Sequence, residues 1–476
     1  MPQSRFRSRP AVARPLLAGA LAAATLAACA DTAPTAPSAS PSLSAAAASG
    51  RSVILGANGV LPADLEAQVA AAGGTLERTI PEIGVAFASG IGRATIRGAE
   101  SVVSDLTVEY VQPSRTADLD VDAATAAEPA VASRADNEPF YAYQWAPAAV
   151  QAPEAWNAGH TGAGVRVAVL DGGLFAAHPD LSAGVDVAAS RSFATGAYNT
   201  DLGTFWHGTH VAGIIGARDN SIGVIGIAPE ATLIGVKVLH GGSGQWSWLL
   251  DGIVYAAKPR AQGGAGAQII NMSLGGYIAN AKDPSIKASI RELSKAIDRA
   301  TRYANEQGTT VIAAAGNNAS NLDENKHDVN LPGMSARVIG VASTAPIGWA
   351  YGNSQFSRQA SYTNFGKAAV TVAAPGGDFA YAGTESCAFR GFTTACWVFD
   401  MYLSTSRAGY SWAAGTSMAS PVTAGIAALV IQANGGTLAP AQVRAKLLQG
   451  AVDLGKPGFD EVYGHGWVNA LRSVSR

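Results

Sequence analysis

The chain has 476 residues, with 35 acidic and 33 basic side chains and a formal net charge of −2. This length predicts about three domains, and the near-balanced charge gives no indication of a nucleic-acid partner. The 54 glycines are typical of a tightly packed α/β protein with many turns.

Residues 1–29 are predicted to form a targeting segment. Arginines precede an apolar stretch at 15–28, which is too short to span a bilayer comfortably. The stretch ends Leu26-Ala27-Ala28-Cys29, which resembles a bacterial lipoprotein box and would place a lipid on Cys29. Plain secretion is the alternative, because Ala28-Cys29-Ala30 also fits a small-residue cleavage site. Residues 30–50, rich in Ala, Pro, Ser and Thr, are predicted to be a disordered linker.

Residues 51–115 have the composition of a small α+β unit. Strands are predicted at 52–55, 84–87 and 107–111, and helices at 62–72 and around 93–103. Residues 116–139 lack any periodicity and are predicted to be an exposed linker.

From residue 140 onward, strand-like and helix-like stretches alternate, which is typical of a parallel sheet covered by helices. The apolar run Val167-Ala168-Val169-Leu170 predicts a buried strand, and Asp171 follows it directly. Acids at the carboxyl ends of parallel strands line the crevice where such sheets bind ligands. Asp171 is therefore a candidate functional residue.

Two later stretches carry possible partners for this acid. His207 opens the small-residue segment at 207–216, and Ser417 stands at the start of a helix-length apolar run. A helix start has unpaired N–H groups and a partial positive charge, which suit a nucleophile whose reaction generates an oxyanion. The chain order Asp, His, Ser matches one of the known orders of a catalytic triad.

The motifs VAVLDGG, HGTHVAG and GTSMASP resemble the three active-site motifs of subtilisin-type serine proteases, the subtilases. The resemblance spans residues 144–470 and implies a three-layer, parallel-sheet α/β catalytic domain at 140–476. It implies peptide-bond hydrolysis through an acyl-enzyme, with Ser417 as nucleophile, His207 as proton carrier and Asp171 orienting the imidazole. Asn317 would donate to the oxyanion. Gly172 departs from the family, which usually has a hydroxyl residue there.

The same resemblance makes residues 51–115 similar to the subtilase propeptide, a folding template and inhibitor, with processing expected in the linker that follows. An unrelated α+β module is the alternative. The implied protein is an exported, autoprocessed zymogen and a monomer that takes protein or peptide substrates. Its membrane contact would run only through the lipid anchor.

Two edges of a substrate cleft follow from the resemblance, and an extended peptide would pair with both of them. The residues that match the cleft and its pockets are Gly242, Ser243, Gly244, Trp246, Leu249, Ser273, Leu274, Gly275, Ala314, Gly316 and Asn330. Trp246 and Leu249 would line the pocket for the fourth residue before the cut. Asn330 would lie near the base of the first pocket, where no acid is found, although Asp328 is close in sequence. Cleavage after uncharged, mostly apolar residues is therefore expected.

A structural calcium ion is also implied. The residues that match the family's ligands are Asp180, Arg218, Asn220, Ile222 and Val224. A carboxylate, an amide and backbone carbonyls are the oxygen ligands that calcium prefers. The family's further ligand from the mature N-terminus has no clear counterpart, and a solvated turn without metal is the alternative.

Cys387 and Cys396 are the only cysteines after Cys29, and a close pair in an exported protein predicts a disulfide. Closing a loop of about ten residues would contribute roughly 2.7 kcal/mol in the loop-entropy model. The alternative to an active enzyme is a catalytically silent, subtilase-like binding protein.

Overall fold

The computed structural model describes residues 50–110, 115–119, 137–278, 284–324 and 328–476. All of these belong to one compact unit, Ala39–Arg476. The predicted targeting segment with Cys29, and nearly all of the predicted linker at 30–50, lie outside the described residues.

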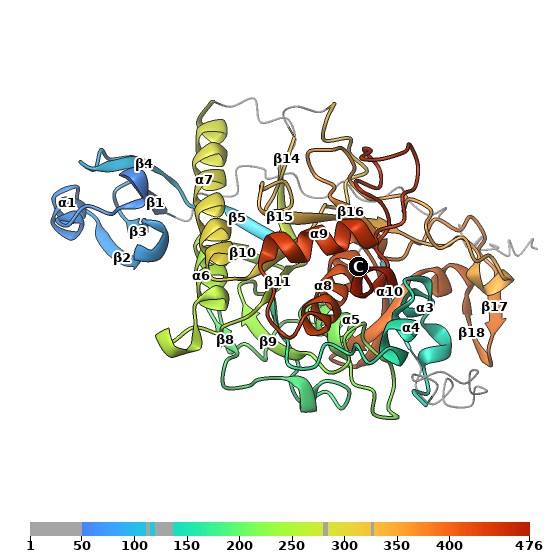
Figure 1. Ribbon diagram of the computed structural model, residues 1–476. Coiled ribbons are helices and arrows are strands. Elements are labelled where there is room, and N and C mark those ends of the chain that lie inside the picture. The colour runs from blue at the N-terminus through green and yellow to red at the C-terminus, as the bar shows by residue number, and fades with distance from the viewer. Residues whose placement is uncertain (1–49, 111–114, 120–136, 279–283, 325–327) are drawn as a thin grey trace, which may run out of the picture. The chain divides into compact units, whose positions relative to one another are not determined.

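A seven-stranded parallel sheet forms the centre of the region that follows residue 140 (Figure 1). The strand order is β16-β15-β13-β11-β7-β9-β8, so the strand that ends in Asp171 lies inside the sheet. Its strands are β7 (Arg166–Asp171), β8 (Arg191–Ser192), β9 (Thr232–Lys237), β11 (Ile269–Met272), β13 (Thr310–Ala314), β15 (Val338–Thr344) and β16 (Val372–Pro375). The predicted fold class is confirmed.

Helices cover both faces of this sheet, and the alternation of side chains along β7 explains why. Val167 and Val169 pack into the apolar cluster of α5 (His207–Gly216) and α8 (Thr416–Ala433). Ala168 and Leu170 point to the other face, into the cluster of α6 (Trp246–Ala257) and α7 (Pro284–Glu306). Both faces are therefore buried, as expected for a parallel sheet. The shorter helices are α3 (Ala146–Ala149), α4 (Ala152–Asn157), α9 (Pro440–Gly450) and α10 (Ala470–Val474).

Helix α8 is the one helix in the described ranges that is long and apolar enough to cross a membrane, and most of it is buried in this protein. It is therefore a core helix. Its buried position reflects its many alanines and its Gly425, where an added Cβ would come within 2.6 Å of Ile227.

The N-terminal unit, residues 51–104, is an antiparallel sheet with strand order β2-β3-β1-β4. Its elements are β1 (Arg51–Gly56), α1 (Leu65–Ala71), β2 (Thr75–Ile80), β3 (Val85–Ser89) and β4 (Ala99–Ser104). The helix predicted around 93–103 is wrong. Residues 99–104 pair with β1, as in Val53 opposite Val103, and this pairing outweighs the local pattern.

Four further strands form a small sheet with the order β10-β5-β12-β14. They are β5 (Thr107–Tyr110), β10 (Ser243–Gln245), β12 (Leu274–Ile278) and β14 (Val329–Leu331). Strand β6 (Arg115–Asp118) pairs instead with β20 (Gly409–Ala414), which pairs with β19 (Tyr402–Ser406). The chain directly after residue 114 is thus a paired strand, where the sequence predicts the start of an exposed linker.

The Cys387–Cys396 disulfide is confirmed. It joins the ends of a hairpin, β17 (Ser386–Phe389) and β18 (Phe392–Ala395). Phe392 of this hairpin stacks on Trp412, with ring centroids 5.7 Å apart. The hairpin is therefore anchored to the aromatic core next to β20.

Candidate active site

Asp171 and His207 are in direct contact at the carboxyl edge of the central sheet. His207 Nδ1 lies 2.9 Å from both carboxylate oxygens of Asp171. Both residues are almost completely buried. The Gly172 N–H donates to Asp171 Oδ1 at 2.7 Å, so a backbone donor also supports the carboxylate. With Nδ1 as the donor to Asp171, the proton-accepting nitrogen of a neutral His207 is Nε2.

The small residue after His207 allows this approach. An added Cβ at Gly208 would lie 2.8 Å from the Gly173 carbonyl and 3.0 Å from Asp171 Cβ. Only glycine lets the first turn of α5 pack this closely on the end of β7. The HG dipeptide noted in the sequence thus has a steric cause.

Ser417 is the second residue of α8, and it contacts the segment that precedes β12. Its Oγ donates to the Ser273 carbonyl at 3.3 Å, and Ser273 Oγ donates to the Ser417 carbonyl at 2.8 Å. Helix α8 packs directly against α5, which begins at His207. The structure therefore places Ser417 at a helix N-terminus, on the helix that neighbours α5.

Asn317 follows β13 and is fixed by the residue that precedes Ser417. Its Oδ1 accepts the Thr416 N–H at 2.9 Å and the Thr416 hydroxyl at 2.8 Å. Since this end of the amide is the acceptor, the other end is its NH2 donor. The amide is therefore oriented by α8 itself, next to the backbone of Ser417.

The two predicted cleft edges, β10 and β12, both pair with the chain's own strand β5. Gly244 lies opposite Val108, and Gly275 lies opposite Glu109, in antiparallel register. An extended segment thus lies between two backbone edges, as the sequence predicts for a bound peptide. Trp246 and Leu249, at the start of α6, are buried beside this sheet. Gly242 adopts a φ of +86°, which favours glycine at the turn before β10.

The predicted first pocket gathers residues from three strand ends. Asn330 Nδ2 donates to the carbonyls of Ala314 and Ala315 at 3.3 and 2.9 Å. Asn330 Oδ1 is buried and has no hydrogen-bond partner among the described residues. It would lie 3.1 and 3.3 Å from a Cβ added at Gly275 and Gly316. The acceptor therefore faces the space between the two glycines. Asp328 is buried and accepts the Ser320 hydroxyl at 3.2 Å.

The predicted calcium loop wraps around Asp180. The Arg218 N–H donates to the Asp180 carbonyl, and the Val224 N–H donates to Asp180 Oδ2 at 3.0 Å. Asp180 Oδ1 is buried without a partner among the described residues. Burial raises the pKa of Asp180 to about 7, against the hydrogen bonds from Val224, Tyr410 and Asn220.

The structure adds to this loop one carboxylate that the sequence did not indicate. Glu138 is buried, and its Oε1 accepts the N–H groups of Asn220 and Ser221 at 2.8 and 3.0 Å. Its Oε2 has no partner within the described ranges. Burial raises the pKa of Glu138. No pattern around residue 138 indicated this role, because the contact spans 82 residues of sequence. The described residues contain no group of three or more His, Cys, Asp or Glu side chains arranged to hold a metal.

Comparison with known proteins agrees with this geometry. Residues 162–466 match the model of the subtilase family, Peptidase_S8. Thermitase of Thermoactinomyces vulgaris is 32% identical over 71% of this chain and 98% of its own length. Subtilisin Savinase of Lederbergia lenta is 35% identical over 68% of this chain and 96% of its own.

A solved structure extends the similarity of fold toward the N-terminus. The epidermin leader peptide processing serine protease of Staphylococcus aureus superposes with a TM-score of 0.68 and 21% identity. It covers 89% of this chain and 97% of its own. At this identity, the likeness concerns the fold alone.

A parallel α/β sheet with an acid–imidazole pair at its carboxyl edge and a serine at a neighbouring helix start defines the class of subtilisin-like hydrolases. The chain belongs to the subtilase family. It is a serine endopeptidase, whose substrates are peptides or proteins.

Proposed function

We propose that Ser417, His207 and Asp171 are the catalytic triad of this protease. The observation that carries the proposal is the buried contact of His207 Nδ1 with the Asp171 carboxylate at 2.9 Å. Ser417 Oγ attacks the scissile carbonyl, and His207 Nε2 takes its proton and later returns it to the leaving amine. Asp171 holds the ring in the required tautomer and stabilises the imidazolium.

The oxyanion of the tetrahedral intermediate would be held by Asn317 and the backbone N–H of Ser417. The Thr416 contacts to Asn317 Oδ1 support this role, because they fix the amide before substrate binds. A preorganised donor stabilises the charge at no cost of reorganisation. In a subtilisin, loss of such a side-chain donor lowers turnover by about 10²–10³.

Replacement of the triad residues should separate this proposal from a silent binding protein. Ser417→Ala and His207→Ala should each lower kcat by about 10⁶, and Asp171→Ala by about 10⁴, the magnitudes found in subtilisin. Hydrolysis of casein by the purified protein, with and without a serine-directed phosphonyl reagent, measures the effect. Ser420→Ala is the matched control, since Ser420 carries a buried hydroxyl on the same helix and lies 2.9 Å from Ser273 Oγ. Near-normal activity in Ser417→Ala would reject the triad.

We further propose that the protein is exported as an autoprocessed zymogen, with the N-terminal unit as its inhibitory propeptide. Support comes from β5, which lies between both cleft edges. Tyr110 lies opposite Leu274, next to Ser273, and Arg115 lies opposite Ala414, next to Gly415. The two strands that residues 111–114 join thus pair with segments next to Ser273 and Gly415, both close in sequence or in contact with Ser417. The cut is therefore proposed between Tyr110 and Arg115, upstream of the linker predicted from sequence.

Ion pairs support the inhibitory role of the N-terminal unit. Arg78 lies 3.0 Å from Asp251 of α6, and Glu100 contacts Lys295 and Arg299 of α7 at 2.6 and 2.7 Å. Val53 and Leu55 share an apolar cluster with α6 and α7. The sheet of the N-terminal unit is thus bonded to α6 and to α7.

Maturation should depend on Ser417. Wild type should yield a shorter soluble form whose N-terminus, read by sequencing, falls between residues 111 and 115. Ser417→Ala should remain full length, and Cys29 lipidation should keep it with the membrane fraction. Ser420→Ala again serves as the control. Normal processing of Ser417→Ala would assign the cut to another protease. A soluble, full-length Ser417→Ala would favour plain secretion.

We propose that the enzyme cleaves after uncharged, mostly apolar residues, with a second apolar preference at Trp246 and Leu249. The neutral Asn330 amide between Gly275 and Gly316 supports this preference. The buried Asn330 Oδ1 would also accept a hydrogen bond from a substrate side chain in this space.

An isosteric exchange tests the position of Asn330. Asn330→Asp places a carboxylate where the amide oxygen lies, and should raise kcat/KM for Lys or Arg before the cut about ten- to hundredfold, because a charged hydrogen bond replaces a neutral one. A peptide library profiles wild type, Asn330→Asp and the control Asp328→Asn. A wild-type profile dominated by Lys or Arg, abolished in Asp328→Asn, would contradict the assignment.

We propose that a structural calcium ion binds at the Asp180 loop. The site fits in chemistry, because Asp180 Oδ1 and Glu138 Oε2 are buried carboxylate oxygens without partners among the described residues. Asp180, Asn220 and Glu138 would hold the ion, with the backbone carbonyls of Arg218, Ile222 and Val224. Bound calcium would be structural and would hold the loop closed.

Calcium should stabilise the folded protein. At a calcium concentration one hundred times Kd, binding to the folded state alone contributes about 2.7 kcal/mol. Excess chelator should therefore lower the Tm, and Glu138→Gln should reduce this difference. The control is Glu230→Gln, a carboxylate outside this loop that bonds to Thr161. Identical melting curves with and without chelator would show that the loop is a turn without metal.

A further inference from the structure

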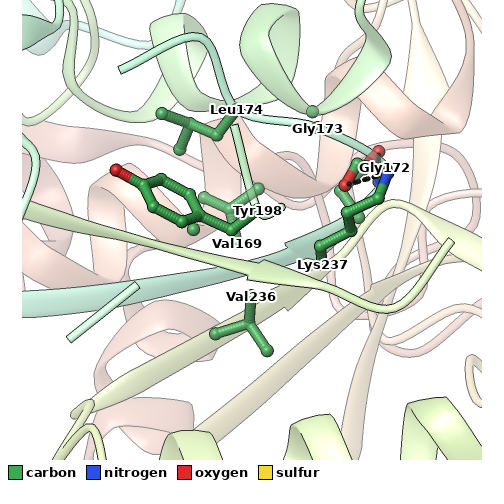
Figure 2. Close-up of a pocket in the computed structure, with 10 residues that line it drawn as sticks. Val169, Gly172, Gly173, Leu174, Tyr198, Val236 and Lys237 are labelled. Atoms are coloured by element: carbon green, nitrogen blue, oxygen red, sulfur yellow. Dashed lines mark hydrogen bonds between the residues drawn. The ribbon is translucent and has the colours of Figure 1, made fainter. Parts of the chain in front are cut away.

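A lysine is buried behind the catalytic carboxylate and takes no part in the proposed triad. Lys237 is the last residue of β9, beside Asp171 in the parallel register, and its side chain is fully buried. Figure 2 shows this side chain directed at Gly172. Its Nζ donates to the Gly172 carbonyl at 3.2 Å and lies 3.8 Å from Asp201 Oδ1.

Asp201 occupies the space that a side chain at position 172 would need. A Cβ added at Gly172 would lie 2.2 Å from Asp201 Oδ2. The Asp201 side chain is only 4% exposed, and its Oδ1 accepts the N–H groups of Leu202 and Gly241, each at 2.9 Å. The Asp201 carboxylate, from another loop, therefore fills the space beside Gly172, the glycine that departs from the family pattern.

The pair interacts in a medium that screens charge poorly. Gly172, Tyr198 and Lys237 line one hollow beside the pair (Figure 2), and the Lys237 side chain itself is fully buried. Burial lowers the pKa of Lys237, while the carboxylates of Asp201 and Asp171 oppose this shift and favour the protonated ammonium. Charges in such surroundings act over several ångströms with an effective dielectric far below that of water.

A short chain of contacts links Lys237 to the triad. Lys237 Nζ holds the Gly172 carbonyl, and the N–H of the same residue donates to Asp171 Oδ1 at 2.7 Å. Asp171 in turn contacts His207. A change at Lys237 therefore reaches the imidazole through one backbone residue and one carboxylate.

We propose that Lys237 and Asp201 are a positioning pair for the triad, which fixes the Gly172 backbone and balances the charge that His207 experiences through Asp171. The inference rests on the proposed function. The ammonium favours the neutral imidazole, and Asp201 offsets part of this effect. The pair thereby acts on the proton transfer that His207 carries out.

Other charged or titratable groups also surround His207, and the pair must act in their presence. Burial lowers the pKa of His210, one turn along α5, to about 3, so this ring is neutral in the working range. His240 follows β9, next to the Gly241 that bonds to Asp201. Among the described residues, Asp171 contacts His207 directly, and the Arg407 guanidinium lies over the ring of Trp206, which precedes His207, 5.5 Å from the ring centroid.

The test is the acid limb of kcat/KM against pH, which reports the essential base of the free enzyme. Lys237→Met should move this limb upward by about 0.5–1 pH unit, since His207 then gains a proton more readily. Asp201→Asn should move it downward by a similar amount. The double variant removes both charges and should return the limb close to the wild-type position. All four proteins are expressed as the full-length chain.

A role in folding alone predicts a different pattern. Both single variants would then lose kcat or Tm with an unchanged limb, or with shifts in the same direction, and either result overturns the proposal. If Lys237→Met does not fold, the acid limbs of the two single variants cannot be compared. The acid limbs of Asp201→Asn and of the double variant then test the proposal. An Asp201→Asn limb at the wild-type position is then the overturning result.

A second measurement separates this inference from the proposed function. In the full-length Ser417→Ala background, the His207 imidazole is titrated by NMR with labelled histidine and assigned by its loss in His207→Gln. Opposite shifts of its midpoint in Lys237→Met and Asp201→Asn support the pair even if the triad assignment fails. An unmoved midpoint rejects the pair even if the enzyme is active.

Discussion

The contact between Asp171 and His207 is the constraint on which the site depends. A carboxylate buried at the end of β7 is costly unless hydrogen bonds and an opposite charge compensate for lost hydration. Here the Gly172 N–H and the His207 ring supply this compensation. The ring reaches the carboxylate only because α5 begins directly above the strand end, with a glycine after the histidine. Strand, turn and helix start are therefore fixed together.

Small residues also allow close packing of α5 and α8 elsewhere in the core. A Cβ at Gly213 of α5 would lie 2.3 Å from Thr405 Oγ1, and one at Gly425 of α8 would lie 2.6 Å from Ile227. Each helix is thus packed closely against a neighbouring segment at its glycine. An added methyl group would push a helix outward, and the residues at its N-terminus would move with it. The glycines of α5 and α8 therefore fix the positions of His207 and Ser417 as well as allowing the helices to pack.

The parts of the fold with strong local signals could be predicted from sequence. The strand before Asp171 and the helices at His207 and Ser417 each combine a distinct motif with an apolar or small-residue run, whereas the cleft edges are indicated only by the resemblance to the family. The strand at residues 99–104 could not be predicted from sequence, because only its pairing with β1 makes it a strand. The same holds for Arg115–Asp118, whose partner β20 lies almost 300 residues away in the chain. Glu138, Asp201 and Lys237 carry no motif, and only the folded chain brings them to the sites they support.

The proposed cleft edges would let one geometry serve both an inhibitor and many substrates. Strand β5 contacts β10 and β12 through backbone groups, at positions that include Gly244 and Gly275. Backbone pairing is independent of side-chain identity, so any extended segment gains these hydrogen bonds. Under the proposed function, discrimination between substrates would come from the pockets beside the strand, which are assigned to Trp246, Leu249 and Asn330. An inhibitory segment of the same chain has a further advantage, because its link to the N-terminal unit raises its effective concentration at the cleft. If the link is cut as proposed, this advantage is lost while the edges stay unchanged, and the cleft would become accessible to other peptides.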